Sequence, residues 1–233
     1  MAKALKALRQ FDQELEDLKT NLLRMAAMAE EAVSKAVASV MTRNSDLARE
    51  VVLDDIHLNQ YELDIEDQGL KLLALRQPLA TDLRLIIAAM RIATELERIG
   101  DQAVNIAERA LELNSREPVE LPIDLKYMAD LTLFMLRTSI DAFVQQDPRL
   151  AVQVCQRDSE IDLLDDEYIQ KILDCMIAES RWVTRLHHFV IIIRNLERIA
   201  DLATNIAEDI VFIVEGKVIK HRCEDWGPYL PSP

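Results

Sequence analysis

The sequence contains few of the residues that build turns, sheets and cross-links. Its 233 residues include 4 glycines, 3 cysteines and only 5% aromatic residues. So little glycine and aromatic content is typical of a mainly helical protein. The cysteines, Cys155, Cys175 and Cys223, are far apart and odd in number. They therefore indicate reduced thiols in a cytoplasmic protein, and neither a disulfide framework nor a Cys-x-x-Cys zinc site.

Three further absences concern membranes, secretion and nucleic acids. No stretch approaches the roughly 18 apolar residues of a membrane-spanning helix, and no apolar run follows the basic N-terminal residues as in a secretory signal. Asp and Glu outnumber Lys and Arg by 41 to 27, which gives a formal net charge of −14. A nucleic acid is not expected as a partner, because its phosphates need a basic face. Cations, or basic patches on other proteins, are compatible with this charge.

The hydrophobic residues recur at spacings of three and four, as in amphipathic helices. Asn44-Ser45-Asp46, Thr81-Asp82 and Asp147-Pro148 offer helix starts, and Gly216 offers a helix end. Residues 114–122 contain two prolines and no periodicity, so they are predicted to be a linker. The expected helices cover about residues 3–42, 47–75, 81–113, 123–146, 148–178 and 180–216.

A repeated motif relates the two halves of the chain. Residues 96–108 read LERIGDQAVNIAE, and residues 196–208 read LERIADLATNIAE. The pattern Asp55-x-x-Leu58-Asn59-x-x-Glu62 likewise matches Asp158-x-x-Ile161-Asp162-x-x-Asp165. We therefore predict an all-α fold of two tandem three-helix bundles related by an internal repeat, similar to spectrin repeats. The expected domains are residues 1–116 and 117–217, followed by an irregular C-terminal tail at 218–233.

The acids of the motif interrupt an apolar stripe. On a helix of 3.6 residues per turn, they fall on the same arc as apolar residues in both copies of the motif. Carboxylates one turn apart repel each other, and more strongly on a partly buried face. Ion pairs from Arg98 and Arg198, protonation of some acids, or a bound cation would each relieve this repulsion. Arg84 falls on the polar face, where a salt bridge is the default role.

The repeat favours the cation, because the preceding helix of each half adds oxygen ligands at i, i+4 spacing. Oxygen ligands favour Mg, Ca, Mn or Fe; Zn is a less typical occupant, since its sites normally contain Cys or His. The candidate ligands are Glu97, Asp101, Glu197, Asp201, Asp158, Asp162 and Asp55. Weaker or outer candidates are Asn105, Asn205, Asn59, Glu62, Glu108 and Glu208.

Three motifs resemble the PhoU proteins of bacterial phosphate signalling. They are the repeated LERI-[G/A]-D-x-x-x-N-I-A-E, the segment RQPLATDLR at 76–84, and EDIVFIVEGKVIKH at 208–221. The resemblance covers about residues 10–221 and implies two three-helix bundles with metal bound at Glu/Asp-x-x-x-Asp motifs. Glu97 with Asp101, Glu197 with Asp201, and Asp158 with Asp162 match this form. Asn59 departs from it, so the first site is expected to be the weaker one.

The resemblance also implies a function. PhoU proteins are negative regulators of the phosphate-starvation response and form adaptors between the ATPase subunit of the Pst transporter and a PhoR-type sensor histidine kinase. No catalysis is implied, and a homodimer at the inner face of the membrane, held there by its partners, is expected. Two alternatives remain open from the residues alone: a metalloenzyme with a carboxylate cluster, and a purely structural helical protein.

Overall fold

The part of the chain that the structure describes folds into six long helices. The computed structural model describes the backbone of residues 2–216 and the side chains of residues 9–216. Within this part of the chain there is no strand, and a short 3₁₀ turn, η1 (Ser180–Trp182), precedes the last helix. The helices are α1 (Ala2–Met41), α2 (Ser45–Arg76), α3 (Ala80–Asn114), α4 (Leu125–Gln145), α5 (Pro148–Ala178) and α6 (Val183–Glu215). The expected tail at 218–233 lies outside the described residues.

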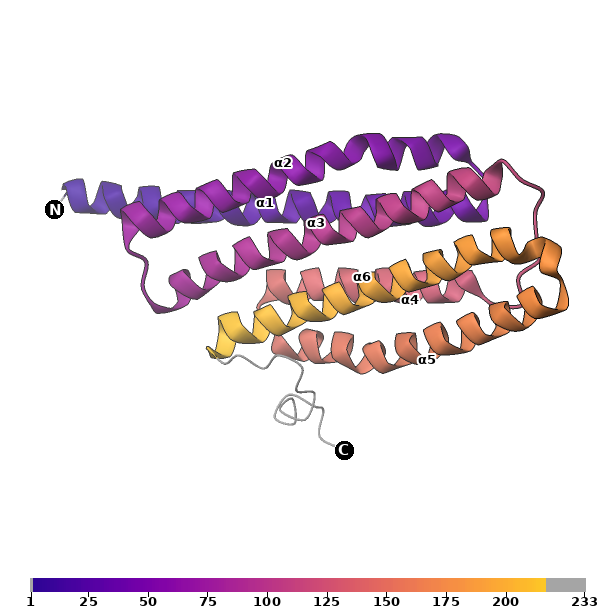
Figure 1. Cartoon of the computed structure of the whole chain (residues 1–233). Coiled ribbons are helices and arrows are strands. Elements are labelled where there is room, and N and C mark those ends of the chain that lie inside the picture. Colours follow the sequence, from indigo (N-terminus) through magenta and orange to yellow (C-terminus); the bar gives the residue numbers. More distant parts are fainter. Residues whose placement is uncertain (1, 217–233) are drawn as a thin grey trace, which may run out of the picture.

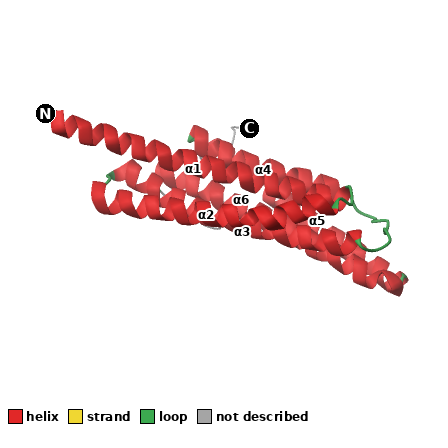
Figure 2. Ribbon diagram, turned by 90° about the horizontal axis from the view of Figure 1, so that it is seen from above, coloured by secondary structure: helices red, strands yellow, loops and turns green. Residues whose placement is uncertain are grey.

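The six helices form two three-helix bundles that lie side by side (Figure 1). Helices α1, α2 and α3 pack against one another, as do α4, α5 and α6, and the bundles meet mainly through α3 and α6. Seen from above, all six helices follow one long axis (Figure 2). The all-α fold of two repeated bundles is confirmed, and the domain boundaries remain a prediction. None of the helices described is apolar over the length needed to cross a bilayer.

The two helices that carry the repeated motif are the most enclosed. Ala103, Ala107 and Ala110 on α3 are fully buried, as are Ala203 and Ala207 on α6. Such small side chains allow the motif helices to lie close to their neighbours, and larger residues such as Ile99 and Ile199 fill the bundle cores. The acids of the motif are therefore mounted on the two most firmly packed helices, a setting that holds their positions.

Most helix ends follow their sequence signals. The Asn44 side chain accepts hydrogen bonds from the backbone of Asp46 and Leu47, and Asp147 accepts one from Arg149. Gly216 ends α6 with a φ of 70°.

One predicted helix start is wrong. Helix α3 begins at Ala80 after Leu79, without a side-chain cap, so Thr81 and Asp82 lie inside its first turn. The Asp82 amide donates instead to the Leu79 carbonyl at 3.1 Å.

Two arginines of α3 hold the C-terminal part of α6. Arg84 Nε donates to the carbonyl of Ile213 at 3.0 Å, and Arg91 Nη1 lies 3.2 Å from Asp209 Oδ1. The Arg91 guanidinium also lies over the Phe212 ring, 5.3 Å from its centroid. The expected salt bridge of Arg84 is therefore replaced by a backbone contact between the bundles.

Candidate metal centres

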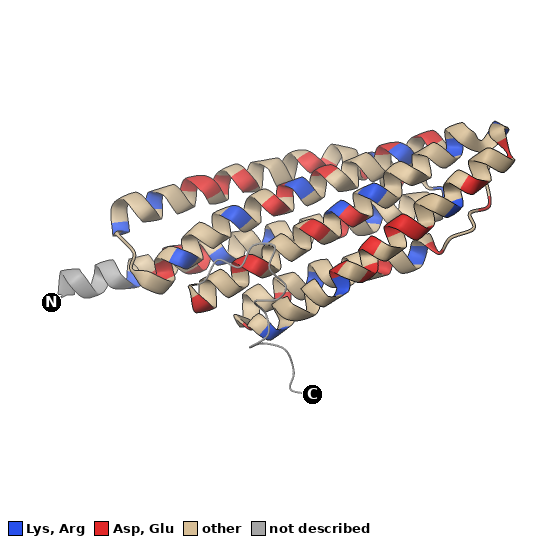
Figure 3. Cartoon of the chain, turned by 60° about the horizontal axis from the view of Figure 1, so that its bottom comes forward, with Lys and Arg blue, Asp and Glu red and all other residues tan. Residues whose placement is uncertain are grey.

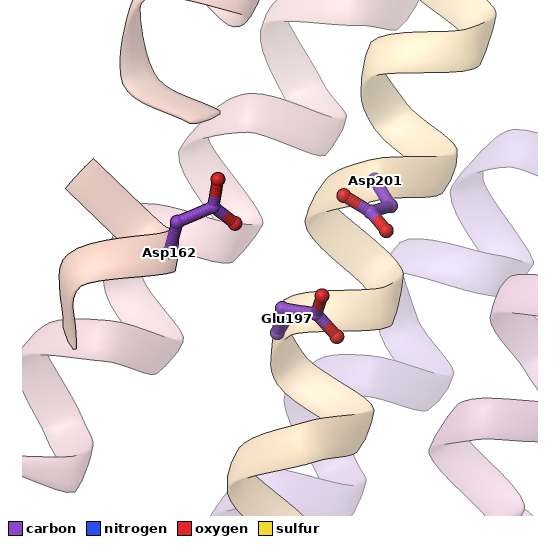
Figure 4. A group of neighbouring side chains, drawn as sticks. All are labelled: Asp162, Glu197 and Asp201. Carbon is purple, nitrogen blue, oxygen red and sulfur yellow. The ribbon is translucent and has the colours of Figure 1, made fainter. Parts of the chain in front are cut away.

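Three carboxylates converge between α5 and α6 in the second bundle. Asp162 on α5 faces Glu197 and Asp201, which lie one turn apart on α6 (Figure 4). One oxygen of each side chain lies within 4.8 Å of the others. The two acidic helix faces therefore meet in the second bundle.

Burial and mutual repulsion disturb the ionisation of this group. Burial, then the neighbouring Asp201, raises the pKa of Glu197 to about 7. Burial, then Asp201 and Asp162, raises the pKa of Asp158 to about 6. Asp158 also accepts a hydrogen bond from Thr204 Oγ1 at 3.3 Å. Either protons or a cation would relieve the repulsion that raises the pKa of Glu197 and Asp158.

One arginine supplies positive charge at the edge of this centre. Arg194 Nη1 lies 2.6 Å from Asp165 Oδ2, and the Asp165 side chain is only 3% exposed. Burial outweighs Arg194, so the pKa of Asp165 is raised. The sequence prediction missed this pair. A signal was present, because Asp165 follows Asp162 by three residues and Arg194 precedes Glu197 by three, which places each pair on one helix face.

The first bundle gathers similar residues in a looser form. Asn59 Nδ2 donates to Asp55 Oδ2 at 3.1 Å, and the remaining side-chain oxygens of both residues are buried without a hydrogen-bond partner in the described structure. Burial raises the pKa of Glu97, and Asp101, Glu62 and Asp55 raise it further. Within residues 9–216, however, a group of three acids at ligand spacing occurs only in the second bundle.

The outer candidates differ in burial. Asn105 and Asn205 are half-buried, Glu108 is exposed and paired with Arg109 at 3.0 Å, and Glu208 is buried. The expectation that all motif acids lean inward is wrong for Asp101, Asp201 and Glu108, which are exposed. These three acids lie at the edge of the apolar stripe that faces solvent. The neighbouring helix of the bundle does not cover that edge. Arg98 is exposed and pairs with Glu95 at 3.1 Å, and Arg198 is also exposed.

The donor set suits a hard cation. In the second bundle all the converging atoms are oxygens, and one side of the group is open to solvent. In the first bundle the buried oxygens Asp55 Oδ1 and Asn59 Oδ1 lack protein donors in the described structure. Carboxylate and amide oxygens are the ligands that Mg, Mn, Ca and Fe prefer. In the second bundle Asp158, Asp162, Glu197 and Asp201 would hold the ion, and in the first Asp55, Glu97 and Asp101. Metal binding remains a prediction.

The family model for the PhoU domain matches residues 22–110 and again residues 125–210. The chain belongs to the PhoU family. The two matched segments fall on the two three-helix bundles, so the internal repeat is a repeat of the PhoU domain.

Relatives and solved structures agree with this PhoU assignment. A phosphate-specific transport system accessory protein PhoU homolog of Pseudomonas putida is 36% identical over 91% of this chain and 83% of its own length. The homolog of Aquifex aeolicus is 35% identical over 90% of this chain and 95% of its own. PhoU from Pseudomonas aeruginosa superposes with a TM-score of 0.85 at 35% identity, over 89% of this chain and all of that structure. The phosphate transport system regulatory protein PhoU from Streptococcus pneumoniae gives 0.84 at 30% identity, over 90% of this chain and 99% of that one.

Proposed function

We propose that this chain is a non-catalytic accessory regulator of phosphate uptake and signalling. It would act as a metal-binding adaptor between the ATPase subunit of the Pst phosphate transporter and a PhoR-type sensor histidine kinase, and repress the phosphate-starvation response. The membership of both bundles in the PhoU family carries this proposal, since relatives that match most of the chain are named as accessory proteins of phosphate transport. The cytoplasmic face of the inner membrane, reached through the partners, and a homodimeric state belong to the same proposal.

The acidic centres would give the adaptor its metal dependence. A cation between Asp162 on α5 and Glu197 and Asp201 on α6 would offset the repulsion that raises the pKa of Glu197. It would also tie two helices of the bundle together at an exposed edge. Fe, Mn, Mg and Zn are the candidate ions, and the all-oxygen donor set supports the first three best.

Partner binding with and without metal tests the proposal. The ATPase subunit and the cytoplasmic part of the kinase would be immobilised separately, and the wild-type protein would be applied after chelator treatment and after reloading with Mn²⁺. Binding is expected to be stronger after reloading, and the Glu197→Ala/Asp201→Ala variant should lose that increase. Glu167→Ala is the control, because Glu167 lies in an exposed ion pair with Lys171 on α5. Failure of the wild-type protein to bind either partner in both metal states would reject the adaptor role.

The metalloenzyme alternative makes a different prediction in the same experiment. A carboxylate-bound ion that activates water would give phosphatase turnover that depends on the metal. Turnover that disappears in Glu197→Ala/Asp201→Ala, with partner binding unchanged, would replace the adaptor by an enzyme. A purely structural helical protein would show neither partner binding nor a difference in metal content between the wild type and this variant.

A further inference from the structure

Helix α2 carries an apolar stripe on its solvent side. Val52, Ile56, Leu63 and Leu70 are 37%, 66%, 58% and 53% exposed. At 100° per residue they fall on one face, and three of them repeat at seven-residue spacing. Helix α2 packs only against α1 and α3 in the described structure, so this face has no partner among the described residues. Single exposed apolar residues are ordinary, whereas several that recur along one helix face indicate a contact surface.

The second bundle has no such stripe on the equivalent helix. In the repeat alignment that pairs Asp55 with Asp158, Ser159 on α5 takes the place of Ile56, and Asp166 that of Leu63. Only Leu70 has an exposed apolar counterpart on α5, Leu173. Both bundles share a fold, so the apolar side chains on α2 are not needed to build a bundle. Because Ile56 and Leu63 are replaced by polar residues on α5, the central part of the stripe indicates a role that belongs to the first bundle alone.

The charges around the stripe define what can cover it. Helix α2 contains eight acidic and three basic residues, and acidic positions recur along it (Figure 3). Each basic side chain is already paired within the chain: Arg49 with Asp46, Lys71 with Asp67, and Arg76 with Glu14. On the helical wheel Asp55 and Glu62 flank one side of the stripe, and Asp64 and Asp67 flank the other. Asp67 is paired with Lys71, whereas Asp55, Glu62 and Asp64 have no basic partner among the ion pairs of the described residues, so both borders of the apolar surface carry negative charge.

This border argues against two possible occupants. A second copy paired antiparallel through α2 about Leu63 would place Glu62 beside the copy's Asp64, which brings like charges together next to the centre of the contact. A membrane surface rich in anionic lipid would be repelled by the same acids. An amphipathic helix with apolar residues at heptad spacing and Lys or Arg on its flanks would satisfy both the apolar stripe and its acidic borders.

We propose that the stripe Val52–Ile56–Leu63–Leu70 on α2 is a docking surface for a basic amphipathic helix of a partner protein. The inference deepens the proposed function, since an adaptor needs such a surface, and it names the chemistry of the segment that binds there. Because Asp55 and Glu62 lie along one edge of the stripe, the docked helix would pass beside the acidic residues of the first bundle.

A pair of designed peptides tests the recognition directly. Each is a three-heptad helix with Leu at positions a and d; one has Lys at e and g, and the other has Glu there. Like charges on each peptide oppose its self-association. Fluorescence anisotropy of labelled peptide is expected to show binding of the Lys peptide by the wild-type protein, and none of the Glu peptide. Equal binding of both peptides would overturn the proposal.

The decisive variant is Ile56→Ser/Leu63→Asp, which copies the residues that α5 has at the equivalent positions. It is expected to weaken binding of the Lys peptide by about tenfold or more, because two apolar contacts are lost. The variant also adds a negative charge, so binding by charge alone would become stronger. Weaker binding of the Lys peptide thus indicates docking on the apolar stripe and not general electrostatic attraction to the acidic protein. Unchanged or tighter binding would overturn the proposal.

The second bundle supplies the matched control. Leu173→Asp/Ile177→Ser makes the same two kinds of substitution at exposed positions on α5, where the side chains are 41% and 83% exposed. This control is expected to bind the Lys peptide like the wild type, and an equal loss in it would overturn the proposal. If the melting curve shows that Ile56→Ser/Leu63→Asp does not fold, Ile56→Gln/Leu63→Gln replaces it, since Gln is a good helix former and adds no charge.

Two further measurements separate the docking surface from its alternatives. Light scattering of the wild type and of Ile56→Ser/Leu63→Asp should give the same mass; a dimer that becomes a monomer in the variant would assign the stripe to a second copy and overturn the proposal. The same variants would then be tested against the transporter ATPase and the kinase. If the wild type binds the Lys peptide through the stripe but neither protein, the adaptor function fails while the docking surface stands.

Discussion

Asn59 donates its side-chain amide to Asp55 at 3.1 Å, within the first bundle, at the position where the second bundle has Asp162. This one difference replaces a carboxylate by a neutral amide and uses an oxygen of Asp55 as a hydrogen-bond acceptor. The three-acid group at ligand spacing includes Asp162 and has no equally close counterpart around Asn59 among the described residues. The two centres are therefore related by the repeat but unequal in charge.

Exchanging these two residues between the bundles should exchange the strengths of the two centres. Asn59→Asp is expected to tighten Mn²⁺ binding in the first bundle on the order of tenfold, because it adds a charged oxygen ligand. Asp162→Asn should weaken binding in the second bundle by a similar factor. Isothermal titration of chelator-treated protein measures both. Identical titrations for the two variants and the wild type would count against both candidate centres.

The stability of chelator-treated protein should fall as the pH rises. In the folded chain the pKa of Glu197 is about 7 and that of Asp158 about 6, against ordinary values of 4.5 and 3.8. Between these values the folded state binds more protons than the unfolded state, so protonation stabilises it below the folded pKa and this contribution is lost above it. Melting temperatures measured from about pH 5.5 to about pH 8 should therefore decrease.

Two variants of the pH experiment assign the effect. Glu197→Gln cannot ionise, so its melting temperature should depend less on pH than that of the wild type. Added Mn²⁺ should restore stability most at the high end of the range, where the acids are charged and can bind it. A wild-type melting temperature that rises across the whole range would show that the burial of Glu197 and Asp158 does not govern this dependence.

Removing Arg194 should destabilise the second bundle more than removing an arginine of equal exposure. Arg194→Met leaves Asp165, which is 3% exposed, without its ion-pair partner, at an expected cost of about 3 kcal/mol in the free energy of unfolding. Arg157→Met is the control, because the Arg157 side chain is 51% exposed against 50% for Arg194, while its partner Glu160 is 32% exposed. That surface pair should contribute less than about 1 kcal/mol.

A second substitution shows whether the cost arises from the stranded charge. Asp165→Asn in the Arg194→Met background should recover part of the lost stability, since a neutral amide is cheaper to bury than an unpaired carboxylate. Urea unfolding curves give all four free energies needed for the double-mutant cycle. Additive losses would show that Arg194 acts independently of Asp165.

The sequence predicts the fold well for two reasons. Amphipathic periodicity can be recognised within each helix, and the repeat can be recognised by aligning the two halves of the chain. Six helices were expected within a few residues of their observed bounds, and the caps at Asn44 and Asp147 followed from residue type. The cap predicted at Thr81-Asp82 is wrong. Their residue types suit a cap, but α3 already begins at Ala80. A cap preference ranks residues and does not fix which backbone position begins the helix.

The site was less predictable, because a helical wheel gives the direction of a side chain from its helix axis. It does not show which residue of another helix lies next to that side chain. It placed Glu97 and Glu197 correctly toward partly buried surroundings, but Asp101 and Asp201, one turn further, are exposed. Burial at the edge of a stripe depends on the crossing of adjacent helices. The Asp165–Arg194 pair was missed for the same reason, since it joins residues on two different helices.

The contact from Arg84 to α6 leads to a last prediction about how the bundles stay together. Arg84 Nε donates to the Ile213 carbonyl at 3.0 Å, near the C-terminal end of α6, where unpaired carbonyls carry partial negative charge. Arg84→Met keeps much of the apolar length and removes the cation, so it should cost about 1–2 kcal/mol. Arg49→Met removes an exposed i, i+3 pair on α2 and should cost much less.

Hydrogen exchange distinguishes a contact between the bundles from a general loss of stability. In Arg84→Met, amide exchange should accelerate in the last two turns of α6, around residues 209–215, by more than in α1 or α4. That pattern follows because Arg84 on α3 holds only this end of α6, whereas the bundle cores remain packed through their own buried residues. Uniform acceleration over all six helices would instead mean a general loss of stability, and acceleration confined to α1, α2 and α3 would mean that Arg84 stabilises the first bundle itself.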